Sequence, residues 1–276
     1  MTGNSYNKQN PKSKIQNPNK SGQVLLIIVM LLATAITIVL AVTFRSTTDT
    51  QLTKLEEDNQ KSLAAAQAGI EEVLKTNSNL SNFSGLNIPA GFSGAANISS
   101  DTSQSFVTPI VQSDDQYTFY MTNYDPLAKS FGTNYFSGSI RLYLQSESNC
   151  PASEVTLITS AATDNIFKYL IDPCGLVQKD GTGNGIIGTS PGGVMPGQNL
   201  NFTYKSDSLA LNNVRLLIVR NLGADSRIGV YSAAANLPVQ GKTIVSQANS
   251  PSGVSKKIQL FQSYPQIPAD FFVTSF

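Results

Sequence analysis

The stretch "NKSGQVLLIIVMLLATAITIVLAVTFRS", Asn19 to Ser46, sets the architecture of this chain of 276 residues. Its 21 residues from Val24 to Phe44 contain no charge, no Pro and no Gly. A helix rises about 1.5 Å per residue, so the run spans roughly 31 Å and matches a bilayer hydrocarbon core of about 30 Å. It is too long for the apolar region of a cleaved secretory signal. The sequence therefore predicts a transmembrane helix over 24–44.

The residues before this helix, 1–22, form a short basic leader. They hold four lysines and no acidic residue, and the whole chain carries +1, so the remainder carries −3. Lysines next to a membrane segment stay on the cytoplasmic side, which predicts an extracytoplasmic body. The body is mildly acidic and has no basic stripe, so no nucleic-acid partner is expected.

The helical pattern continues beyond Arg45. Apolar residues recur at spacings of three, four or their multiples, which is the pattern of one helix face: Leu52, Leu55, Leu63, Ala66, Ile70 and Val73. The sequence predicts one helix over 23–75, about 80 Å long, with a transmembrane half (24–44) and an amphipathic half (45–75). Asn77 or Asn79 is expected to end it in the left-handed conformation.

The rest of the chain has the composition of an antiparallel β protein. A Ser-, Asn- and Gly-rich segment, 76–105, indicates a linker. Nine segments with alternating polarity then predict strands: 116–121, 139–145, 154–160, 165–171, 199–205, 213–219, 227–232, 242–248 and 256–263. The expected fold class is α+β, a long N-terminal helix followed by a β-sandwich-like domain over 106–276. Whether 106–174 and 199–276 form one domain or two halves stays open, and the Gly-rich segment 175–199 is expected to be a long surface loop.

The chain has two cysteines, Cys150 and Cys174. An even number of cysteines in an exported domain favours a disulfide over two unpaired buried thiols. Closing the loop between them would stabilise the fold by about 3–4 kcal/mol in the chain-entropy model.

No residue pattern predicts catalysis, a cofactor or a metal. Histidine is absent, which removes the commonest general base and any Ser-His-Asp arrangement. The formal fingerprint Gly183-x-Gly185-x-x-Gly188 is followed by Pro191 and cannot open a helix, so nucleotide binding is not expected. A Ca²⁺ site near Asp180 and Asn184 lacks EF-hand spacing, and solvated loop polarity is the favoured interpretation. Other carboxylates are scattered along the chain: Asp114, Asp115, Asp125 and Glu147.

Two stretches, "KSGQVLLIIVMLLATAITIVL" and "KSLAAAQAGIEEVL", together resemble the N-terminal region of type IV prepilins. The second is similar to the "AAxAGIE" stretch of PilX-type minor pilins and of the K-type pseudopilin of type II secretion. The resemblance covers about the first 75 residues. It implies that prepilin peptidase cuts between Gly22 and Gln23 and that Gln23 becomes N-methylated. Lys20 is then the last basic residue of the removed leader. It also implies a helix-packing motif: Ala66, Ala68, Gly69, Ile70 and Glu71.

One residue departs from the family pattern. Most members have Glu as the fifth residue after the cut, where this chain has Ile27. That Glu is thought to pair with the terminal amine of a neighbouring subunit, and a carboxylate in an apolar filament core needs such a partner. A subunit without it is expected at a minor, tip or initiating position.

The resemblance implies a structural subunit rather than an enzyme. Its partners would be other pilin subunits through the N-terminal helix, prepilin peptidase and the membrane. It would be a single-pass cytoplasmic-membrane protein that enters a cell-surface filament after assembly. The alternative is a signal-anchored surface protein that keeps its leader and uses the β-domain to bind a ligand or a surface. A membrane-tethered hydrolase is disfavoured by the missing His.

Overall fold

The computed structural model describes residues 21–146, 150–160, 165–177 and 185–268. Its helix, α1 (Ser21–Thr76), is uninterrupted from the start of the apolar stretch to the end of the amphipathic one. It ends at Asn77, whose φ of 50° lies in the left-handed region and whose N–H donates to the Val73 carbonyl at 2.8 Å. Asn tolerates this conformation better than most residues. The long helix and the Asn77 cap are confirmed.

Thirteen strands follow among the described residues: β1 (Ser93–Ser99), β2 (Ser105–Val111), β3 (Gln116–Tyr120), β4 (Thr122–Asp125), β5 (Ser130–Ser146), β6 (Ser153–Thr159), β7 (Asn165–Ile171), β8 (Thr189–Val194), β9 (Asn201–Ser206), β10 (Leu209–Asn221), β11 (Ser226–Ser232), β12 (Gly241–Asn249) and β13 (Ser255–Ser263). Each of the nine strands expected from the alternating pattern is present. All pairs between named strands are antiparallel.

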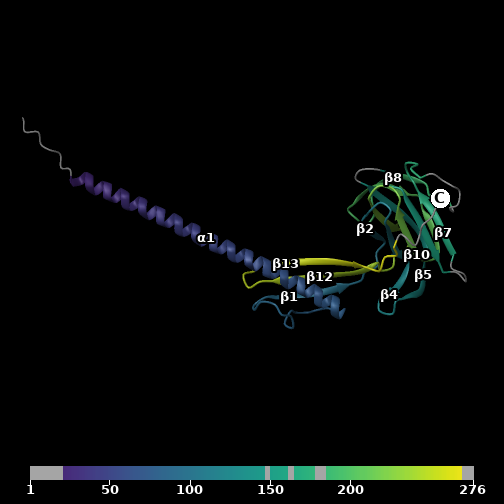
Figure 1. The fold of residues 1–276 in the computed structure, drawn as a ribbon, viewed down its shortest axis with the longest axis horizontal. Coiled ribbons are helices and arrows are strands. Elements are labelled where there is room, and N and C mark those ends of the chain that lie inside the picture. The colour runs from purple at the N-terminus through teal and green to yellow at the C-terminus, as the bar shows by residue number, and fades with distance from the viewer. Residues whose placement is uncertain (1–20, 147–149, 161–164, 178–184, 269–276) are drawn as a thin grey trace, which may run out of the picture. The chain divides into compact units, whose positions relative to one another are not determined.

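The chain divides into two compact units, 1–61 and 62–276. In the second unit, the end of α1 packs on a three-stranded sheet of order β1-β12-β13 (Figure 1). The helix contributes small and branched side chains to one buried cluster with the sheet: Ala65, Ala66, Ile70 and Val73, against Phe83, Ala96, Ile244 and Ala248. Small side chains on the helix let its backbone approach the sheet closely.

The other ten strands form a larger sheet that folds into two facing layers. One layer has the order β3-β10-β6-β7, and the other has the order β2-β11-β5-β9-β8. The tenth strand, β4, pairs with the first part of β5. The long strands β5 and β10 pair with each other where the chain crosses between the layers, for example at Ile140 and Leu209. One core cluster takes side chains from both layers, such as Leu217 of β10 and Leu142 of β5. This is the packing of a β-sandwich.

The prediction of a linker over 76–105 is wrong. Strand β1 lies in this segment and pairs along its length with β12. The preceding loop is also anchored, because Leu80 forms a bridge with Ala96 and Phe83 is only 3% exposed. The Ser- and Asn-rich composition of the segment gave no sign of these contacts. Only a few of its apolar side chains, such as Phe83 and Ala96, are buried against the helix and the sheet.

One further expectation for the β region needs correction, and the question of one domain or two halves receives an answer. The segment 175–199 is not one long loop, because β8 lies within it and Met195 is fully buried; residues 178–184, which include Asp180 and Asn184, lie outside the described residues. The two suggested halves are interleaved, because β10 pairs with β5 and β6 while β11 pairs with β2 and β5. Their strands build one sandwich, except for β12 and β13, which belong to the three-stranded sheet with β1.

Candidate functional site

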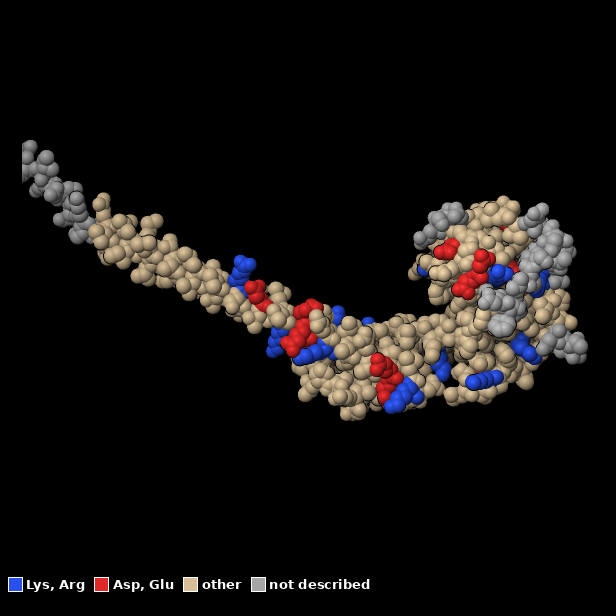
Figure 2. Space-filling model, in the orientation of Figure 1, with Lys and Arg blue, Asp and Glu red and all other residues tan. Residues whose placement is uncertain are grey.

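The apolar part of α1 is the most unusual surface of the described chain. From Val24 to Phe44, its large apolar side chains are each between 50% and 79% exposed. The face of this part of the helix that Figure 2 shows carries no charged residue, and after Lys20 the next charged residue in the sequence is Arg45. The three threonines return their hydroxyls to backbone carbonyls of the helix at 2.8–2.9 Å: Thr34, Thr37 and Thr43. The helix is therefore long and apolar enough to cross a membrane, and its polar groups are satisfied internally.

The predicted processing junction lies at the start of this helix. Gly22 and Gln23 belong to the first turn of α1, and Gln23 is exposed. Lys20 and the other leader lysines lie outside the described residues. Ile27 is 56% exposed within the apolar stretch. Cleavage and methylation at this junction stay predictions.

The stretch "AAxAGIE" lies where α1 meets the three-stranded sheet. Ala66 is fully buried, Gly69 is buried and Ile70 is 8% exposed, whereas Ala68 is half-buried and Glu71 is exposed. The motif thus has a role inside this chain, because its small residues form the helix face that contacts the sheet.

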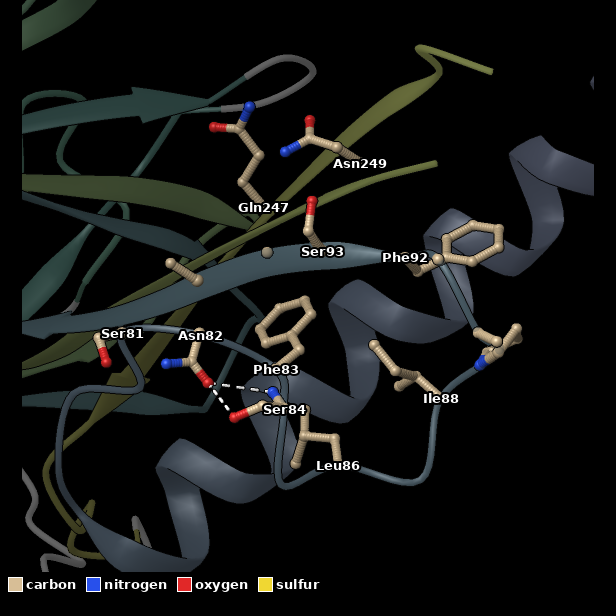
Figure 3. Close-up of a pocket in the computed structure, with 15 residues that line it drawn as sticks. Ser81, Asn82, Phe83, Ser84, Leu86, Ile88, Phe92, Ser93, Gln247 and Asn249 are labelled. Carbon is tan, nitrogen blue, oxygen red and sulfur yellow. Dashed lines mark hydrogen bonds between the residues drawn. The ribbon is translucent and has the colours of Figure 1, made fainter. Parts of the chain in front are cut away.

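Phe83 packs between two glycines of this interface. A Cβ added at Gly69 of α1 would lie 2.8 Å from the Phe83 ring and 2.6 Å from Ser246 Oγ. A Cβ at Gly94 of β1 would lie 2.2 Å from the same ring. Figure 3 shows Phe83 between β1 and the helix. The sequence offered no signal for this wedge, because an isolated Phe in a Ser- and Asn-rich segment has no periodicity.

A cleft of about 750 Å³ adjoins this wedge (Figure 3). The loop after α1, the start of β1, and Gln247 and Asn249 of β12 line it, and no lining residue is charged. Asn82 Oδ1 accepts hydrogen bonds from the backbone N–H (3.1 Å) and the hydroxyl of Ser84, which shapes the loop. With amide and hydroxyl groups alone, the cleft has no group suited to general acid–base catalysis at neutral pH.

Cys150 and Cys174 form a disulfide, with their Cα atoms 6.3 Å apart. The bridge closes the open end of the β6–β7 hairpin, where Ser153 pairs with Ile171. β7 is the last strand of its layer, and its outer side is bonded to the segment around Ile186 through Leu170, so the disulfide holds the edge strand of this layer. The expected pairing is confirmed.

The scattered carboxylates have local structural contacts. Asp125 Oδ1 accepts from the N–H groups of Leu127 and Ala128 (2.8 and 3.2 Å) and forms the β4–β5 turn. Asp114 forms an ion pair with Arg220, with Oδ1 3.5 Å from Nη2. Glu147 lies outside the described residues. Within the described ranges, no group of three or more His, Cys, Asp or Glu side chains could hold a metal ion.

No family model, curated protein sequence or solved structure matches this chain.

Proposed function

We propose that this chain is a minor pilin-like structural subunit that prepilin peptidase processes and that assembles into, initiates or caps a type IV pilus or pseudopilus filament. The observation that supports this most is the continuity of α1. Its exposed apolar part runs without a break into the part that the β-domain holds through Ala66, Gly69 and Ile70. A helix built in this way can transmit its position in a membrane or filament to the domain that it carries.

Ile27 supports a minor or terminal position. The stretch 24–44 contains no carboxylate, so a neighbouring subunit's terminal amine would find no anionic partner there. Labelling this protein along purified filaments tests the position. Labels at the ends, or at low stoichiometry, are expected, whereas even labelling at the stoichiometry of the shaft would contradict it.

N-terminal sequencing of the membrane-extracted protein tests the proposal. We expect the mature chain to begin at Gln23 and to carry one added methyl group on its amine. Replacing Gly22 by Leu adds a side chain beside the bond to be cut, so processing should stop while membrane insertion continues. Gly85→Leu is a matched control, because a Cβ at Gly85 has no neighbour within 4 Å.

The same experiment separates the alternative, a signal-anchored surface protein with a binding β-domain. The alternative shares the apolar helix but predicts that Met1 or its successor remains at the N-terminus. A chain that keeps residues 1–22 in a cell with active prepilin peptidase would exclude the pilin-like proposal.

A further inference from the structure

A second cleft lies between the sandwich and the three-stranded sheet, within the unit 62–276. Its volume is about 440 Å³, which is in the range of roughly 300–1,000 Å³ for small-molecule sites. Its walls come from β2 and the segment before it, from the start of β12, from β13, and from Gln198 in the β8–β9 turn.

One wall of this cleft is aromatic. Phe261 of β13 lies with its ring 5.6 Å from that of Phe106 of β2, and it is still 40% exposed. Phe106 is itself held by the sandwich core, 6.0 Å from Phe119 in an edge-to-face arrangement. The Phe261 ring also lies over Gly241, where a Cβ would come within 2.8 Å of Cζ. These contacts hold the Phe261 ring in place while part of the ring stays exposed.

The facing groups are hydroxyls, carboxamides and one carboxylate. Ser105 is 4% exposed, and its Oγ accepts a hydrogen bond from Gln198 Nε2 at 3.2 Å. Gly197, with φ of +76°, leaves the space beside Ser105 that a Cβ would fill. Further polar groups line the opening: Asp101, Ser103, Thr243 and Gln259. These groups both donate and accept hydrogen bonds.

The charge of the lining selects the ligand class. Asp101 is the one charged residue among those that line the cleft, and no Lys or Arg does. Phosphates, nucleotides and acidic peptides are recognised mainly by cationic side chains, so they do not fit here. We propose that this cleft binds a neutral saccharide. The apolar C–H face of the sugar would stack on Phe261, and its hydroxyls would bond to Gln259, Asp101 and the hydroxyls of the opposite wall.

Saturation-transfer NMR on the full chain tests this. The protein is kept in an amine-oxide detergent, since detergents with sugar headgroups would compete. The probes are glucose, galactose, mannose and N-acetylglucosamine, each titrated to millimolar concentrations. We expect at least one to receive magnetisation on its ring C–H protons, and Phe261→Ala to weaken its binding about tenfold.

Leu260→Ala is the matched control, because Leu260 is the adjacent residue, is similarly exposed at 38%, and points to the other face of the sheet. Its affinity should stay within about twofold of wild type. Gln259→Ala changes an exposed side chain of the cleft and should weaken binding without altering thermal unfolding. The proposal is overturned if none of the four sugars binds, or if binding survives both Phe261→Ala and Gln259→Ala. It is also overturned if a neutral proline-rich peptide alone binds in a Phe261-dependent manner.

Discussion

At the scale of single residues, Gly69 shows how one position can serve both a helix and a contact. Glycine in a helix interior is about 1 kcal/mol less favourable than alanine. In α1 this cost is offset because the missing Cβ makes room for Phe83 and Ser246. The family-like motif is therefore explained, at this residue, by packing within one chain.

Gly69→Ala should destabilise the β-domain by about 1–3 kcal/mol, since the clash with Phe83 outweighs the gain in helix propensity. Phe83→Leu should relieve the clash, so the double variant should lose less than the sum of the single changes. Thermal unfolding followed by circular dichroism measures each value. A Gly69→Ala protein more stable than wild type would show that the wedge is not tight.

Tyr117 makes the stability of the sandwich sensitive to alkaline pH. Burial raises the pKa of Tyr117 to about 12, from about 10 in the unfolded chain. The folded state therefore favours the neutral phenol, and this contribution is complete below about pH 10 and is lost as pH rises toward 12. Tyr117→Phe cannot ionise, so the free energy of unfolding should fall less steeply in the variant than in wild type over this window. Denaturant titrations at several pH values test this, and parallel profiles would contradict it.

At the scale of elements, the edge strand β3 is closed by side chains rather than by another strand. Its inner edge pairs with β10. On its outer edge, the Tyr120 N–H donates to Gln240 Oε1 at 2.9 Å and the Gln240 amide returns a bond to the Tyr120 carbonyl at 2.8 Å. On the same edge, Gln266 Oε1 accepts a hydrogen bond from the Thr118 N–H at 2.6 Å. Closed edges of this kind resist pairing with other chains.

Gln240→Ala should cost about 2–4 kcal/mol, because it leaves a buried N–H and a buried carbonyl of β3 without partners. Chemical denaturation gives the loss, and hydrogen exchange at the Tyr120 amide should accelerate. Gln247→Ala removes an exposed Gln that bonds only to Ser255 among the contacts seen, and it should change stability by less than about 0.5 kcal/mol. Equal losses of unfolding free energy in the two variants would contradict a stabilising role for the bonds between Gln240 and Tyr120.

At the scale of the whole molecule, α1 belongs to two units, and the boundary falls after Lys61. A chain that starts at Ser62 keeps the helix residues that cover the three-stranded sheet, so it should fold and stay in solution without detergent. A chain that starts at Asn77 lacks Ala65, Ala66, Ile70 and Val73 and exposes Ile244 and Ala248. Its unfolding temperature should fall by about 10 °C or more. Identical unfolding temperatures for the two chains would show that the helix does not stabilise the sheet.

Much of this architecture is local and can be predicted from the amino-acid order. The helix over 24–44 follows from its uninterrupted apolar length, and its continuation over 45–75 follows from a period of 3.6. The Asn77 cap follows from the tolerance of Asn for the left-handed conformation, and the nine expected strands follow from a period of two. Four strands were not predicted: β1 and β8 are rich in Ser, Ala and Gly, β2 contains Pro109, and β4 has only four residues.

The tertiary structure supplied what depends on residues far apart in sequence. Gln240 meets Tyr120 across 120 positions, and Phe106 meets Phe261 across the junction of two sheets. Such contacts cannot be predicted from the local periodicity, because the two side chains that form each contact lie far apart in the sequence. The amino-acid order therefore established the helix, most strands and the cysteine pair. The Phe83 wedge, the closed edge of β3 and the saccharide-sized cleft exist only because folding brings distant side chains into contact.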